Sequence, residues 1–358
     1  MNATRQLHDL GQSLWLDNIT RDLLTSGTLG RYIRDLSVTG LTSNPTIFER
    51  AISGSAAYDA QIRDLVASGR SGEDLFFELA IDDLTRAADL FAPIHEQTAG
   101  VDGWVSLEVS PTLAHDAGAT ISAARALHAK AARPNIFIEI PGTAEGLPAV
   151  EEAIFAGVPV NATLLFSAEH CMGAADAYMR GLERRIAAGF SPDVRSVASV
   201  FISRWDKASA AQVPPKLRNE LGNAVGAQAY ATYRGLLDSD RWQRLANRGA
   251  LPQRLLFAST GTKDPAASDV LYVDSLAAPH TVNTMPEETL LAFADHGEAG
   301  TALPPGGGDY ARILEAYVKA GVDPAALAAK LQNDGVDAFA ASWEDLLTSV
   351  AEKGGAER

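Results

Sequence analysis

The sequence is poor in cysteine and in long apolar runs. Its one cysteine, Cys171, leaves no intrachain disulfide and no cysteine cluster for a metal. No run of about 18 apolar residues could span a membrane, and the N-terminal segment lacks the apolar core of a secretion signal. We therefore expect a cytoplasmic protein that does not cross a membrane.

Basic residues are also scarce. Lys and Arg number 30 against 45 Asp and Glu, which gives a formal net charge of −15. Nucleic acids and anionic membranes are bound by basic surfaces, so this charge argues against both as partners. An anionic substrate would need a local basic pocket.

What is present is a repeated pattern. Short runs rich in β-branched or aromatic residues recur, and each is followed by a segment with helical periodicity. The pattern predicts the α/β class and a (β/α)8 barrel formed by residues 1–358 as one domain. An open doubly wound sheet is the alternative, but no glycine-rich dinucleotide motif follows the first run. The predicted strands are 13–17, 40–44, 105–109, 136–140, 160–166, 198–203, 255–260 and 280–285.

Two regions contain more than the repeated strand and helix pattern requires. Residues 45–104 are too long for one crossover and contain two helical patterns, so we expect extra helices after the second strand. Residues 301–310 are rich in Pro and Gly and predict a loop. Beyond it, three C-terminal helices are expected at about 308–353.

Active sites of such barrels form at the carboxyl ends of the strands, so polar residues there are the candidates. Carboxylates at several strand ends could act as acid or base around a reacting carbon, with a threonine holding a water. Cationic and hydroxyl side chains after the sixth and seventh strands indicate a phosphate site, and hence a phosphorylated sugar. The candidates are Asp17, Ser43, Asn44, Glu108, Glu139, Thr163, Ser199, Arg204, Ser259 and Lys263.

Simpler structural roles remain open for some of these residues. Asp17 alone could cap the following helix, and Asn44 with Pro45 could form a turn. Lys263 lacks the surroundings of a nucleotide-binding P-loop. Glu139 could form a buried ion pair with Arg204 or Lys263.

Several segments resemble transaldolases, in particular the longer bacterial type. The resemblance covers nearly the whole chain. It rests on "GLTSNPTIF" (40–48), "NIFIEIPGTAEGLPAVEEAIFAGVPVNATLLFS" (135–167), "SVASVFISRWD", "FASTGTKDP", "YVDSLAAPHTVNTMP" and "FADHG".

The resemblance implies a (β/α)8 fold and transfer of a dihydroxyacetone unit between sugar phosphates, without a metal or organic cofactor. The family's reaction converts sedoheptulose 7-phosphate and glyceraldehyde 3-phosphate into erythrose 4-phosphate and fructose 6-phosphate in the pentose phosphate pathway. The roles it implies are acid/base for Asp17, water binding for Glu108 with Thr163, hydroxyl contacts for Asn44 and Ser199, lining for Phe201, and phosphate binding for Arg204 and Lys263.

One position departs from the family pattern. Transaldolases carry an imine-forming lysine where this sequence has Glu139. A lysine imine holds the substrate and accepts electrons from the cleaved bond, and a carboxylate can do neither. We therefore expect ordinary transaldolase turnover to be absent or strongly impaired.

Three interpretations of Glu139 stay open. The chain could be an inactive transaldolase with an intact sugar-phosphate site. It could be a repurposed enzyme in which Glu139, Glu108 and Asp17 perform acid/base chemistry or bind a hard cation. It could also be a binding protein without turnover. A relocated nucleophile at Lys207 or Lys263 is a further alternative, and the sequence leaves monomer or dimer open.

Overall fold

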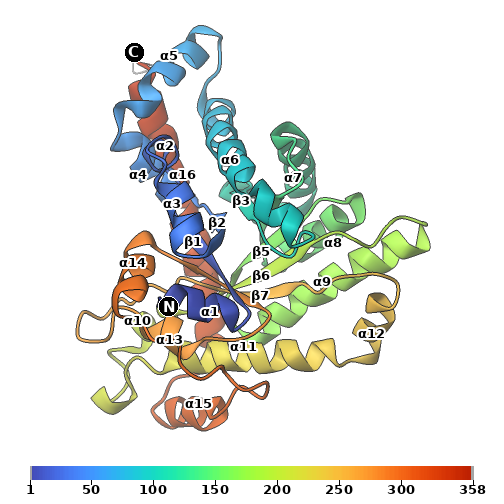
Figure 1. Ribbon diagram of the computed structural model, residues 1–358, viewed down its shortest axis with the longest axis vertical. Helices are drawn as coiled ribbons and strands as arrows, with labels where there is room; N and C mark the ends of the chain where they lie inside the picture. The colour runs from blue at the N-terminus through green and yellow to red at the C-terminus, as the bar shows by residue number, and fades with distance from the viewer. Residues whose placement is uncertain (1, 356–358) are drawn as a thin grey trace.

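The computed structural model describes residues 2–355, and within them eight parallel strands close into a barrel in chain order (Figure 1). This confirms the predicted (β/α)8 fold. Most strand residues are buried on both faces, as expected for a parallel sheet enclosed by helices. The strands are β1 (Gln12–Asp17), β2 (Val38–Thr42), β3 (Trp104–Glu108), β4 (Ile136–Pro141), β5 (Val160–Leu165), β6 (Ser196–Phe201), β7 (Arg254–Ala258) and β8 (Thr281–Met285).

Helices surround the barrel, and the extra helices expected after the second strand are present as α4 to α6. Three short 3-10 turns lie at Ala56–Tyr58, Pro111–Leu113 and Pro215–Leu217. The α-helices are α1 (Ala3–Asp9), α2 (Arg21–Thr25), α3 (Thr28–Asp35), α4 (Pro45–Ser53), α5 (Asp59–Ala67), α6 (Gly72–Gln97), α7 (Ala117–Ala131), α8 (Gly146–Ala156), α9 (Ala168–Ala187), α10 (Ser203–Ser209), α11 (Leu221–Leu237), α12 (Asp240–Ala246), α13 (Leu271–Ser275), α14 (Glu287–His296), α15 (Tyr310–Lys319) and α16 (Pro324–Lys353).

The C-terminal region corrects one prediction: the second and third expected helices are the single helix α16. Gly335 lies inside this helix, where it permits close packing. A Cβ at this position would lie 3.1 Å from Leu164 and 3.2 Å from the guanidinium of Arg204. Gln332 donates hydrogen bonds to the carbonyls of Gly142 (3.1 Å), just after β4, and Leu164 (3.0 Å), near the end of β5. The helix therefore packs on the carboxyl end of the barrel, and in Figure 1 it continues beside α4.

An aromatic layer fills the barrel interior between its two ends. Trp104 stacks on Phe137 with ring centroids 4.0 Å apart, and Trp15 lies 6.1 Å from Phe137. Trp15 needs the glycine opposite it on β2, because a Cβ on Gly40 would lie 2.6 Å from the indole ring. All three aromatic side chains are buried. The layer separates a carboxyl-end cavity from an amino-end cavity.

In the part of the chain from residue 2 to residue 355, no helix is both long and apolar enough to cross a membrane.

Candidate active site

The predicted site residues, except Glu108, line one cavity of about 280 Å³ at the carboxyl end of the barrel. They come from the ends of β1, β4, β5 and β6 and from the segments after β2, β6 and β7. The wall also includes residues that the sequence analysis did not select. These are Thr42, Thr46, Ile47, Arg50, Asn161, Ala258, Gly261, Thr284, Pro286, Glu288 and Phe339.

Glu139 contributes a buried carboxyl group to this cavity. Its side chain points inward from β4, and its Oε1 is buried without a hydrogen-bond partner among residues 2–355. Burial raises the pKa of Glu139 well above the usual glutamate range, and the charge of Asp17 raises it further, while a hydrogen bond from Ser106 opposes the shift. Burial thus makes ionisation of Glu139 unfavourable.

Glu108 is the register neighbour of Glu139 on β3. Both of its carboxyl oxygens are buried without a hydrogen-bond partner in the described chain. Burial raises the pKa of Glu108 well above its usual range, with further upward contributions from the charges of Glu139 and Asp17. Two such neighbours cannot both ionise at low cost, so the pair is expected to retain at least one proton at neutral pH.

Glu108 does not line the main cavity. It faces a small adjacent cavity bounded by Leu107, Phe48 and Trp343, and the two cavities share Ser43 and Asn44 in their walls. Glu108 and Thr163 therefore line two adjacent cavities, and their joint binding of a water stays a prediction.

Asp17 is the third acidic group. Its Oδ1 accepts a hydrogen bond from the Thr42 hydroxyl at 2.9 Å, and Thr42 also pairs with Thr284 at 2.7 Å. Burial raises the pKa of Asp17 to about 6, while Thr42 and the charge of Lys263 act in the opposite direction. A carboxyl group with this pKa can exchange a proton near neutral pH, as an acid/base catalyst must.

Two structural hypotheses about Glu139 are wrong. No ion pair joins Glu139 to Arg204, to Lys263 or to any other cation between residues 2 and 355. Nor does any group of three His, Cys, Asp or Glu side chains in this range converge as metal ligands would, so Asp17, Glu108 and Glu139 do not form the hard-cation site considered above.

Arg204 forms the cationic part of the wall. Its guanidinium lies 5.1 Å from the ring centroid of Phe201 and 5.8 Å from that of Phe339 on α16. Burial lowers the pKa of Arg204, and the charge of Asp334 opposes this. No hydrogen bond or ion pair occupies the guanidinium within the described residues, so its donors are available for an anion.

Lys263 and Lys207 are placed less favourably for covalent chemistry than a lysine at position 139 would be. Lys263 lines the cavity but is exposed, at its rim. Lys207 is exposed on α10 and does not line the cavity. Within the described chain, Lys263 is thus the only amine in the wall, and it is exposed, whereas Glu139 on β4 is buried.

Hydroxyl and amide groups complete the site. Ser199 donates to Asn161 Oδ1 at 2.6 Å, and Asn44 caps α4 by accepting from the amide of Ile47 at 3.0 Å. The pairing register of β5 with β6 shifts between Ala162 and Leu165. Such bulges are often found beside functional residues, and this one includes Thr163.

Two further candidates also have structural partners. Ser43 donates to the carbonyl of Ser106 at 2.9 Å, and the hydroxyls of Ser259 and Ser203 share a hydrogen bond of 2.9 Å. Of the residues that sequence analysis missed, Asn161 carried a signal, since it precedes Thr163 by two and faces the same side of its strand. Arg50 and Phe339 lie on helices and carried none.

Comparison with known proteins identifies relatives along the whole chain. A family profile described as Transaldolase/Fructose-6-phosphate aldolase matches residues 14–350. A protein named transaldolase from Saccharopolyspora erythraea is 45% identical over 354 residues, 97% of this chain and 96% of the relative. One from Thermobifida fusca is 45% identical over 358 residues (98% and 97%), and a "Transaldolase 2" from Nostoc sp. is 38% identical over 372 residues (99% and 98%).

Proposed function

Because this chain belongs to the transaldolase/fructose-6-phosphate aldolase family of enzymes, we propose that its carboxyl-end cavity binds phosphorylated sugars but does not support imine-dependent transaldolase turnover. The observation that carries the proposal is the buried carboxyl group of Glu139 in the cavity wall, whose Oε1 has no hydrogen-bond partner in residues 2–355. A carboxyl group offers no nitrogen to condense with a ketone, and the exposed Lys263 lies at the rim.

The chemical type of each side chain in the wall suggests which part of a sugar phosphate it would contact. The free guanidinium of Arg204 would bind the phosphate, with Lys263 as a second, weaker contact. Asn44, Ser199, Ser43 and Ser259 would hydrogen-bond the sugar hydroxyls.

The remaining residues would act around the reacting carbons. Asp17, with its pKa of about 6, would transfer the proton at the carbon–carbon bond. Thr163 would hold a water beside it, Glu108 would act from the neighbouring cavity, and Phe201 would orient the guanidinium of Arg204. The ancestral reaction would be dihydroxyacetone transfer in the pentose phosphate pathway.

The test is the variant Glu139→Lys. We expect it to gain transfer from fructose 6-phosphate to erythrose 4-phosphate, on the order of 10³-fold or more above the native protein, because the missing nucleophile is restored in an otherwise complete site. Glu139→Arg is the matched control, since it adds a charge but no nucleophilic amine. A folded Glu139→Lys variant without activity would contradict the proposal.

A second function is favoured by one observation: Asp17 and Glu139 both have raised pKa values and line the same cavity. Such a pair could move protons between adjacent carbons and isomerise a sugar phosphate. This function predicts turnover by the native protein that is lost in Glu139→Gln. Sugar-phosphate binding without turnover in either protein would instead indicate a binding role.

We propose that the protein acts in the cytoplasm and that residues 1–358 work as one domain, as a monomer or a dimer. Light scattering of the purified protein would determine the oligomeric state.

A further inference from the structure

A second and larger cavity lies at the opposite, amino end of the barrel. Its volume is about 600 Å³, within the range of roughly 300–1,000 Å³ that is usual for small-molecule sites. Its wall combines the amino ends of β1, β3, β6 and β7 with α11 and with the loops that precede the strands. None of its residues lines the candidate active site.

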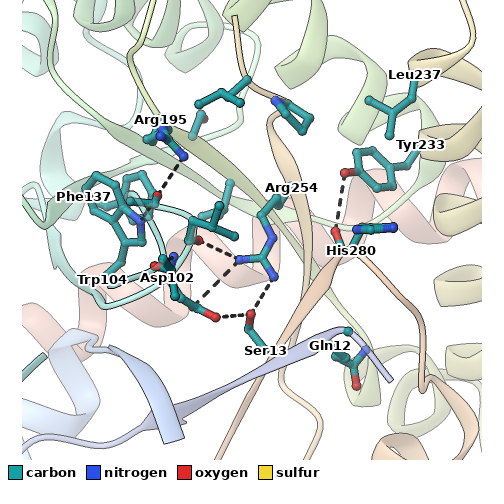
Figure 2. A pocket seen from close by; sticks show the side chains of 18 of the residues that line it. Gln12, Ser13, Asp102, Trp104, Phe137, Arg195, Tyr233, Leu237, Arg254 and His280 are labelled. Carbon is teal, nitrogen blue, oxygen red and sulfur yellow. Dashed lines mark hydrogen bonds and ion pairs between the residues drawn. The ribbon is translucent and has the colours of Figure 1, made fainter. Parts of the chain in front are cut away.

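Apolar groups make up most of the wall. In Figure 2, the stacked rings of Trp104 and Phe137 lie on one side, and Tyr233 and Leu237 lie on the other, with Arg254 between them. Trp104, Phe137 and Tyr233 are buried. A space bounded by flat rings on one side and an aliphatic side chain on the other suits an aromatic or otherwise apolar body.

Positive charge is concentrated in the same wall, which contrasts with the formal net charge of −15 for the whole chain. Three arginines line the cavity, Arg195, Arg234 and Arg254, whereas Asp102 is the only acidic residue in its described wall. Asp102 is already occupied: it accepts hydrogen bonds from Ser13 and from Trp15 Nε1.

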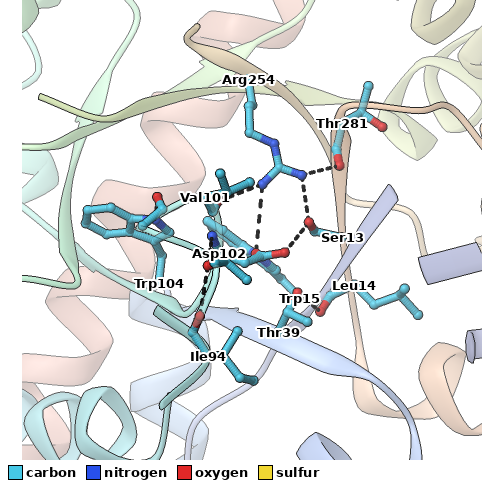
Figure 3. Close-up of polar contacts among 12 residues, drawn as sticks. Ser13, Leu14, Trp15, Thr39, Ile94, Val101, Asp102, Trp104, Arg254 and Thr281 are labelled. Carbon is cyan, nitrogen blue, oxygen red and sulfur yellow. Dashed lines mark hydrogen bonds and ion pairs between the residues drawn. The ribbon is translucent and has the colours of Figure 1, made fainter. Parts of the chain in front are cut away.

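Two of these arginines are fixed by the protein. Arg254 donates to the carbonyls of Val101 (2.9 Å) and Thr281 (2.8 Å) and to the Ser13 hydroxyl (2.6 Å), and it lies 3.8 Å from Asp102 (Figure 3). Arg195 donates to two carbonyls of the loop at 99–100 and pairs with Asp193.

Arg234 differs from them. It lies on α11, is half-buried, and has no hydrogen bond or ion pair with any residue from 2 to 355. Its charge is close enough to Tyr233 to lower the pKa of that phenol, although burial raises this pKa to about 12 overall. An unpaired guanidinium beside an apolar cavity is a ready partner for an anionic group.

We propose that this amino-end cavity binds a small organic anion, a carboxylate, sulfonate or phosphate ester with an aromatic or apolar body. The anionic group pairs with Arg234, and the body packs between Trp104 with Phe137 and Tyr233 with Leu237. The proposal is independent of the function proposed for the carboxyl-end cavity.

The test uses 8-anilinonaphthalene-1-sulfonate, an aromatic sulfonate whose fluorescence rises on binding to apolar sites. We expect saturable binding to the native protein, and about tenfold weaker binding to Arg234→Gln, the loss of one charge-assisted hydrogen bond. Arg248→Gln is the matched control, because Arg248 is exposed and lines neither cavity, yet the charge change is the same. N-phenyl-1-naphthylamine, which lacks the sulfonate, should bind about tenfold more weakly than the sulfonate to the native protein.

Two further measurements determine whether the probe binds in the amino-end cavity. Leu237→Trp fills the cavity from α11 and should weaken sulfonate binding, whereas fructose 6-phosphate at the carboxyl end should not displace the probe. Equal binding by the native protein and Arg234→Gln, equal binding of the charged and neutral probes, displacement by fructose 6-phosphate, or the absence of saturable binding would each overturn the proposal.

Discussion

At the amino end of the barrel, the buried carboxylate of Asp102 has a hydrogen-bond donor for each oxygen and a nearby guanidinium. At the carboxyl end, Glu108 and Glu139 bury three carboxyl oxygens that have no partner in residues 2–355. Burial of a polar group without a partner costs about 1–3 kcal/mol. The hydrogen bonds of Asp102 stabilise the barrel. The unpaired oxygens of Glu108 and Glu139 lower its stability, and a binding or catalytic role would explain why they are there.

Removing one buried acidic group at each end tests most directly whether the two ends differ in their contribution to stability. Asp102→Asn should lower the free energy of unfolding by about 2–4 kcal/mol, because it leaves Arg254 without its countercharge and turns a donor toward Ser13 or Trp15. Glu139→Gln should leave this free energy unchanged or raise it at pH 8. Urea unfolding of both variants measures the difference, and equal losses at the two ends would contradict it.

The affinity for fructose 6-phosphate should distinguish the free arginine, Arg204, from the fixed arginine, Arg254. Arg204→Ala should weaken binding of fructose 6-phosphate by about 10–100-fold, the value of charge-assisted hydrogen bonds. Arg254→Met should not change this affinity, since Arg254 is fixed at the other end of the barrel. Calorimetric titration of both variants, with circular dichroism to verify folding, tests this.

Lys263→Ala should weaken the same binding only several-fold, because the side chain is exposed and its charge is screened. Titrations at low and high salt provide the check: the contribution of Lys263 should shrink with salt more than that of Arg204 does. A larger loss for Lys263→Ala than for Arg204→Ala would contradict the assignment of Arg204 as the main phosphate ligand.

A further effect is expected in the pH dependence of stability. Glu108 and Glu139 have raised pKa values in the folded protein, so the folded state holds protons that the unfolded chain releases above the ordinary glutamate value of 4.5. Stability should therefore fall as the pH rises above this value, until the two folded-state groups have also lost their protons. In Glu108→Gln/Glu139→Gln the fall should be smaller, and an unchanged slope would count against the raised pKa values.

Sequence alone predicted the barrel and about half of the residues that line the carboxyl-end cavity, because the units repeat and active-site residues follow parallel strands. It extended the sixth strand to residue 203, whereas β6 ends at Phe201 and Ser203 begins α10, since an apolar run does not mark where the ladder ends. It divided α16 at residues 333–336, which include Gly335, because a helical glycine kept for close packing has the same appearance as one that ends a helix.

The amino-end cavity could not be predicted. Its arginines lie before β6, on α11 and on β7 with no common spacing, and only the closed barrel brings Arg195, Arg234 and Arg254 to one wall. The position of Glu108 in a separate cavity also depends on packing, here against Phe48 and Trp343 from α4 and α16.

The most direct test of the central claim is borohydride reduction in the presence of fructose 6-phosphate, followed by mass measurement of the intact protein and its peptides. Borohydride converts an imine into a stable amine and so records any covalent linkage through nitrogen. We predict no adduct on the native protein and one adduct, at position 139, on Glu139→Lys. A reduced sugar adduct on Lys207, Lys263 or any other lysine of the native protein would contradict the account.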